Sequence, residues 1–88
     1  MQVIICNIQM FSNDQMIYVF DTETQTNIYA QKVDLNNIPE AVCALAQQYG
    51  ITEVKLHGDT SFNSLWAQEI ETTYSLNYNH NTLNVEVI

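Results

Sequence analysis

The sequence predicts an α/β (α+β) protein with a five-stranded mixed sheet and two helices, in the order βββαβαβ. Three observations predict this class. The first third of the chain has the apolar patterning of strands, a segment in the middle has helical spacing with start and stop signals, and two later short strands are separated by a second helical segment. With 88 residues, 47% of them apolar, the chain suffices for one core and not for two, so residues 1–88 are expected to form a single domain.

The first three strands are expected to follow one another as an antiparallel meander. The first, Gln2 to Met10, is apolar on both faces over its first half, which is typical of a strand inside a sheet. Turn residues at 11–14 lead to a second strand, Gln15 to Asp21, which is again apolar on both faces. The third, Thr26 to Val33, is more polar, and its polarity suits a sheet edge.

The first helix has the clearest signals in the chain. Asn37 is a good N-cap residue, Pro39 lies in the first turn, and Glu40 follows the cap by three residues. Apolar residues then recur at helical spacing until Gly50 ends the pattern. These signals predict a helix over Ile38 to Tyr49.

The last third predicts a strand, a helix and a strand. Residues 51–57 alternate with period 2 and end at Gly58, and Leu83 to Ile88 alternate in the same way. Asp59, Thr60 or Ser61 can cap the helix between them. The expected buried stripe of this helix consists of Phe62, Leu65, Trp66, Ile70 and Tyr74.

This order of elements predicts that one face of the sheet is uncovered. Strand-to-strand crossovers are right-handed, so if the fourth and fifth strands add successively beside the first, both helices lie on the same face. The other face would then present apolar side chains in an area larger than monomers usually expose. Depending on strand register, the expected interface residues are Val3, Ile5, Ile17, Val19 and Tyr29, or their alternates.

The charge balance excludes several classes of partner. Ten carboxylates face two lysines and no arginine, which gives a formal net charge of −8 and a sequence pI near 4.1. Such a surface repels phosphate, so we expect no direct binding to nucleic acid, including duplex DNA, and none to anionic membranes. No apolar run approaches the roughly 20 residues that span a bilayer. Cys6 and Cys43 lie in apolar contexts and are expected to be buried thiols of a cytoplasmic protein.

The chain resembles the front part of the ribonuclease H-like fold. The resemblance lies in the order of elements and in a strand that ends Lys55-Leu56-His57-Gly58-Asp59 before a helix. It implies three metal-binding acids: one in the middle of the first strand, one on the first helix and one after the fourth strand. Glu40 and Asp59 match the second and third, but the first strand offers only the neutral amides Asn7 and Gln9, which cannot supply the charge that a bridging Mg²⁺ needs. We therefore expect no nuclease activity.

Other constellations in the sequence favour packing over chemistry. His57, Asp59 and His80 have no metal-ligand spacing, so neither a metal nor another cofactor is expected. Trp66 and the five tyrosines lack the basic neighbours of a base-stacking platform, which favours a core position for Trp66. The sequence holds no glycine-rich phosphate loop, CxxC pair or nucleophile elbow.

The sequence therefore predicts a small, acidic, non-enzymatic protein-binding or inhibitory factor, in the style of bacteriophage-encoded proteins that act in the host cytoplasm. It would bind a protein partner or a second copy of itself through the uncovered face or an acidic rim, and a homodimer should be disrupted by a charge at Ile17. The expected rim consists of Asp21, Glu23, Glu53 and Asp59. One alternative is a DNA mimic, which requires its carboxylates to form a row. The other is a reduced ribonuclease H-like nuclease that uses Glu40 and Asp59.

Overall fold

The computed structural model contains the seven predicted elements in the predicted order, plus one short 3-10 turn. It describes residues 1–9, 11–58, 60–78 and 82–88. The elements are β1 (Gln2–Ile8), β2 (Asp14–Asp21), β3 (Thr26–Asp34), the 3-10 turn (Leu35–Asn37), α1 (Ile38–Tyr49), β4 (Glu53–Gly58), α2 (Thr60–Asn77) and β5 (Asn84–Val87).

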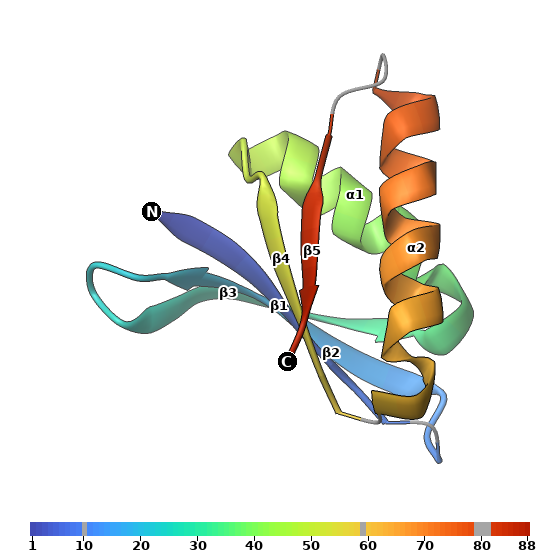
Figure 1. The fold of residues 1–88 in the computed structure, drawn as a ribbon. Helices are drawn as coiled ribbons and strands as arrows, with labels where there is room; N and C mark the ends of the chain where they lie inside the picture. Colours follow the sequence, from blue (N-terminus) through green and yellow to red (C-terminus); the bar gives the residue numbers. More distant parts are fainter. Residues whose placement is uncertain (10, 59, 79–81) are drawn as a thin grey trace.

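The five strands form one mixed sheet in the order β3-β2-β1-β4-β5, with β1 in the centre. The three strands β1, β2 and β3 pair antiparallel, whereas β4 pairs parallel to β1 and β5 parallel to β4. Figure 1 shows both helices on the same side of this sheet, and one core joins them to it. The predicted mixed sheet and the placement of both helices on one face are thus confirmed, while a relationship to the ribonuclease H-like fold stays a prediction.

The first strand ends earlier than predicted, because a side chain takes over its backbone pairing. The buried amide of Gln15 accepts a hydrogen bond from the Gln9 backbone N–H at 2.7 Å. Its nitrogen donates to the Gln9 and Ser12 carbonyl oxygens, each at 2.7 Å. Gln9 is therefore bonded to the side chain of Gln15 instead of continuing the ladder, and Met10, the predicted last residue, lies outside the described residues.

The ends of α1 agree with the prediction in position, but its start differs in mechanism. Asn37 occupies the N-cap position without a side-chain capping bond. Instead, the Asp34 carboxylate accepts a hydrogen bond from the Asn36 backbone N–H at 2.9 Å and caps the short turn that leads into the helix. Gly50 ends α1 in the left-handed conformation, with φ of 65°.

The second helix buries part of the predicted stripe, of which the Phe62 side chain lies outside the described part of the structure. Ile70 and Tyr74 are buried as expected, and Trp66 packs against the core. Leu65, predicted inside, is 64% exposed, because α2 turns Asn63 and Ala67 toward the core instead. The spacing from Asn63 to Ala67, Ile70 and Tyr74 places those side chains along one side of the helix, and Leu65 projects from another.

The strand register corrects three of the predicted interface residues. Ile17 pairs with Cys6 and Val19 with Ile4, so both side chains point to the helix-covered face, where each is fully buried in the core. Tyr29 also belongs to that side, since its ring lies 6.1 Å from the ring of Tyr49 on α1. A charge at Ile17 would therefore disrupt the core rather than separate a dimer.

Both cysteines are free thiols in the core, on β1 and α1. Burial raises the pKa of Cys6 to about 12 and that of Cys43 to about 11. The Cys43 Sγ donates a weak hydrogen bond to the Ile70 carbonyl oxygen at 3.6 Å. These environments are those of structural cysteines, since a reactive thiol needs exposure and a low pKa.

We expect both thiols to stay unmodified when the native protein is incubated with a disulfide reagent at pH 8. Neither thiol is accessible or ionised in the folded state at that pH, because both pKa values are raised well above it. Following the absorbance of the released thiolate should show no rapid reaction in buffer. Two equivalents should react promptly in denaturant, which serves as the control. Rapid native labelling of one equivalent would show that Cys6 or Cys43 opens to solvent.

Candidate interface on the open sheet face

The sheet face that carries no described helix is called the open face below. Its members follow from the register, because residues directly opposite each other on neighbouring strands share a face. Val3 pairs with Phe20, and Ile5 lies between Tyr18 and Lys55. By pairing and alternation, the open face consists of Val3, Ile5, Asn7, Asp14, Met16, Tyr18, Phe20, Asn27, Ala30, Lys32, Asp34, Glu53, Lys55, His57, Asn84 and Glu86.

The centre of the open face is apolar and hollowed. A shallow cavity of about 650 Å³ is lined by Ile5, Asn7, Tyr18, Phe20, Asn27 and His57. Ile5, Tyr18 and Phe20 are only half-buried there, while Val3 is covered by its neighbours. The predicted residues Val3 and Ile5 thus lie on the open face, and Met16, Tyr18 and Phe20 take the places expected for Ile17 and Val19.

Charge on the open face is less one-sided than in the chain as a whole. Lys32 and Lys55, the only two lysines of the protein, both lie on this face, on β3 and β4. Glu53 and Glu86 lie on the same face, and Glu86 is directly opposite Lys55 on β5. Among the described residues neither lysine forms an ion pair. Asp14 and Asp34, which pair with each other at one end of β2 and β3, lie on this face too. Two lysines against four carboxylates give this surface a formal charge of −2, a small part of the −8 that the protein carries.

The predicted acidic rim is only partly assembled. Asp21 and Glu53 lie at the end of the sheet where β1 begins, opposite Gln2 and beside Val3 respectively. The Asp21 carboxylate accepts hydrogen bonds from the Glu23 and Thr24 backbone N–H groups at 2.9 and 3.3 Å, so it stabilises the turn. Glu23 pairs with the terminal amine of Met1 at 3.5 Å. Asp59, the fourth predicted member, lies outside the described residues.

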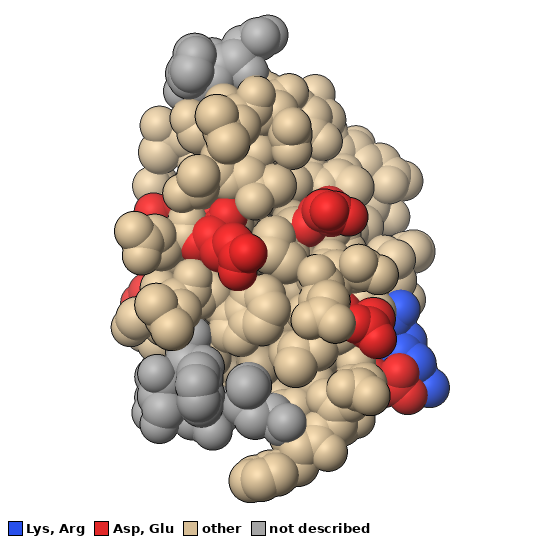
Figure 2. Space-filling model, turned by 90° about the vertical axis from the view of Figure 1, so that its right-hand side faces the viewer, with Lys and Arg blue, Asp and Glu red and all other residues tan. Residues whose placement is uncertain are grey.

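On the side of the molecule where α2 lies, the described carboxylates do not form the row that DNA mimicry requires. Figure 2 shows the side of the molecule where α2 lies: its acidic residues form separate groups, and those at one edge stand beside a basic side chain. Three others serve turns and termini: Asp21, Asp34 and Glu23 bond to backbone groups or to the terminal amine. A phosphate-like spacing along one ridge is not seen on this side.

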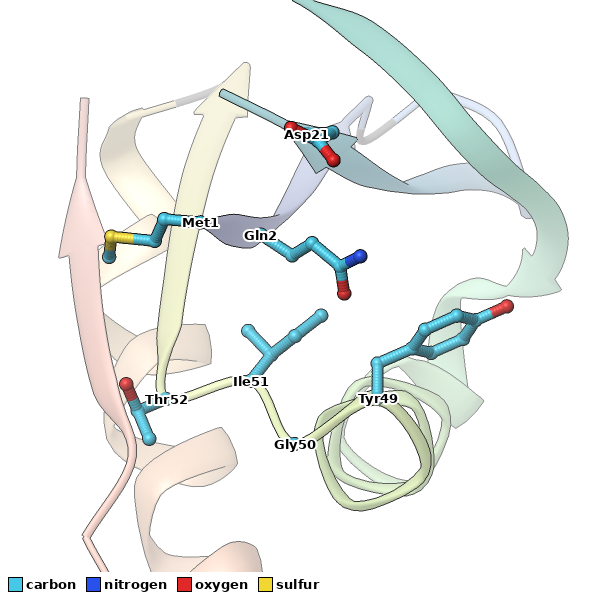
Figure 3. A pocket seen from close by; sticks show the side chains of 7 residues that line it. All are labelled: Met1, Gln2, Asp21, Tyr49, Gly50, Ile51 and Thr52. Atoms are coloured by element: carbon cyan, nitrogen blue, oxygen red, sulfur yellow. The ribbon is translucent and has the colours of Figure 1, made fainter. Parts of the chain in front are cut away.

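A second cavity lies at the end of the sheet, between the start of β1 and the loop that follows α1. It measures about 360 Å³ and is lined by Met1, Gln2, Asp21, Tyr49, Gly50, Ile51 and Thr52. Figure 3 shows the Gln2 amide reaching into it from one side and the Tyr49 ring standing at the other. Asp21 is its one acidic side chain and is already bonded in the turn. Within the described structure the Asp21 carboxylate bonds to the turn and not to the Tyr49 or Thr52 hydroxyl, so a base is not held against a nucleophile here.

The residues that the ribonuclease H resemblance singled out are not brought together by the described structure. Asn7 lines the open-face cavity beside His57, whereas Glu40 lines a separate pocket at the β3 edge with Lys32 and Asn37. Asp59 lies outside the described residues, as does His80. Within the part of the chain that the structure describes, no three His, Cys, Asp or Glu side chains are grouped to hold a metal ion.

No protein-family model matches the chain, and a search of curated proteins finds no similar one. None of the helices in the described ranges is long and apolar enough to cross a membrane. The site therefore has to be interpreted from its own geometry. Sequence reasoning missed Met16, Tyr18, Phe20 and Lys32 as members of the open face, and only the pairing of β2 with β1 and β3 could have identified them.

Proposed function

We propose that the protein is a non-enzymatic protein-binding factor that works as a homodimer, with the open face as the surface that receives the second copy. The observation that carries this proposal is the apolar centre of a face that no described element covers. Val3, Ile5, Met16, Tyr18 and Phe20 lie together there, and both helices pack on the opposite side. Val3 is covered by its neighbours, and the other four side chains keep part of their apolar surface in water. Exposed apolar patches often mark interaction sites.

The size of the open face suits a dimer. The molecule measures 31 × 31 × 20 Å between its outermost Cα atoms, and its short dimension fits a sheet with one layer of helices. A round face of that width covers on the order of 750 Å², close to the roughly 800 Å² per partner of standard interfaces. Each Å² of apolar surface removed from water contributes roughly 25 cal/mol before association costs are deducted.

The charge of the open face favours a second copy over a polyanion. The two lysines can pair with carboxylates of the second copy across a twofold interface, whereas a nucleic acid would meet four carboxylates on this face in a protein of net charge −8. The remaining repulsion between two acidic molecules acts mostly at the rim, because the Debye length is about 8 Å at physiological ionic strength. The dimer should therefore weaken at low salt. Two free, buried thiols support a reducing cytoplasm as its compartment.

The test is the effect of a new charge on the open face compared with the same charge on the helix layer. Sedimentation equilibrium at tens of micromolar should give a dimer for the wild type. Tyr18→Asp and Met16→Asp should each raise the dissociation constant by at least about tenfold, because each would bury an unpaired carboxylate in the interface. Leu76→Asp, at a residue of α2 that is 73% exposed, adds the same charge away from the open face and should leave the dimer intact.

Circular dichroism of each variant shows whether the fold survives, since the two open-face side chains are half-buried in the free chain. A wild type that sediments as a strict monomer at these concentrations contradicts the proposal. The proposal is also contradicted if Tyr18→Asp and Met16→Asp both remain folded and associate as strongly as Leu76→Asp.

A further inference from the structure

We infer that the two copies pack with their twofold axis along β1, so that β3 of one copy lies over β5 of the other and Lys32 comes within one row of Glu86 across the interface. This inference rests on the proposed function, since it specifies the arrangement of that dimer. When two copies of one face pack together, the twofold axis must lie in the plane between them. It can run along the strands, which exchanges the two edges of the sheet, or across them, which lays each strand over its own copy.

The rows of the open face show which side chains each direction would bring together. One row across the sheet contains Ala30, Tyr18, Ile5, Lys55 and Glu86. An axis across the strands along this row would place Lys55 against Lys55 and Glu86 against Glu86. Like charges placed directly opposite each other are unfavourable in a desolvated interface.

An axis along β1 replaces these repulsions with attractions. It leaves Val3 and Ile5 of both copies in the apolar centre, since both residues lie on the axis strand. Lys55, one strand from the axis, comes over β2 of the other copy at the row of Tyr18, whose ring can receive the ammonium group. Two sheets stacked this way keep their strands within about 30° of each other, which is the common aligned packing.

The outer strands supply the ion pair. Lys32 lies on β3, opposite Met16, and Glu86 lies on β5, one row further along the sheet, opposite Lys55. The exchange of edges sets these two charges near each other twice, once on each side of the axis. Each pair lies at the border of the apolar centre, where it fixes the direction of packing more than it adds affinity.

The decisive experiment is a charge exchange followed by sedimentation. Glu86→Lys should raise the dimer dissociation constant about tenfold, because it sets two cations together, and Lys32→Glu should do the same with two anions. The double variant, Lys32→Glu with Glu86→Lys, should return to within about threefold of the wild type, because the pair is restored with its signs reversed. Glu71→Lys, at an exposed position on α2, is the matched control for Glu86→Lys.

The sign of the Glu86→Lys effect separates this arrangement from general electrostatics. Exchanging one glutamate for lysine changes the net charge from −8 to −6, which by itself would tighten self-association. Glu71→Lys should show that small tightening, while Glu86→Lys should show the opposite. Equal behaviour of the two variants, or a double variant as weak as the weaker single one, overturns the axis along β1. If Tyr18→Asp weakens association but the double charge variant does not regain the affinity of the wild type, this axis is refuted and the proposed dimer is not. A wild type that sediments as a monomer refutes both.

Discussion

Replacing Gly58 with alanine is expected to lower the free energy of unfolding by about 3 kcal/mol, because two separate costs add at this position. Gly58 has φ of 106°, a conformation that side chains rarely adopt. A Cβ built there would overlap the carbonyl oxygen of Ile8 and lie 2.9 Å from its carbonyl carbon and nitrogen. Gly58 pairs with Ile8 where β4 ends beside β1, so neither backbone can withdraw without breaking the ladder at the centre of the sheet.

Gly50→Ala is the matched control, since Gly50 also has a positive φ, of 65°, but nothing lies within 4 Å of its added Cβ. It should cost only about 1 kcal/mol, which is the conformational term alone. Urea denaturation of both variants and of the wild type measures the difference. Equal destabilisation by the two substitutions would show that the contact with Ile8 relaxes easily and that backbone conformation accounts for the whole effect.

Gly58 illustrates what the sequence can and cannot reveal about this fold. Its position after an alternating segment was enough to predict where the fourth strand ends, because glycine is unfavourable inside strands and common at their ends. The close approach to Ile8 depends on which strand lies beside β4, and that is a property of the assembled sheet. Local signals therefore placed the strand and helix ends within a few residues, while contacts between distant segments needed the structure.

The open face shows the same limit for the candidate site. Both alternating sets of side chains on β2 are apolar, Ile17 and Val19 on one and Tyr18 and Phe20 on the other. A shift of pairing by one residue exchanges the two faces, and the hydrophobic pattern favours neither choice. Large aromatic side chains took the open face, and the compact β-branched ones took the helix-covered core. The existence of an uncovered face followed from the order of elements, whereas its composition depended on register.

Two buried amides were also beyond sequence reasoning, because glutamine and asparagine normally lie at the surface. Gln15 is 2% exposed, and its side chain makes three hydrogen bonds to the backbone of the β1–β2 turn. Asn63 is fully buried on α2, and both its Oδ1 and its Nδ2 lack a partner in the described structure. The two amides are equally buried but differ in energy. Gln15 forms protein hydrogen bonds in place of the hydrogen bonds to water that it loses on burial, and Asn63 does not.

Apolar substitution at these two positions is therefore expected to change stability in opposite directions. Gln15→Met keeps the length of the side chain but removes three hydrogen bonds, and it should lower the free energy of unfolding by about 2 to 3 kcal/mol. Asn63→Leu keeps the branched shape and removes two unpaired polar atoms, so it should raise that free energy by about 1 to 2 kcal/mol. Urea denaturation of the two variants measures both effects. Asn63→Ala, which also removes the amide but leaves a void, should fall below Asn63→Leu in stability. A clear loss of stability in Asn63→Leu would mean that the amide has a bonding partner in solution, and the opposite signs expected for the two positions would then be wrong.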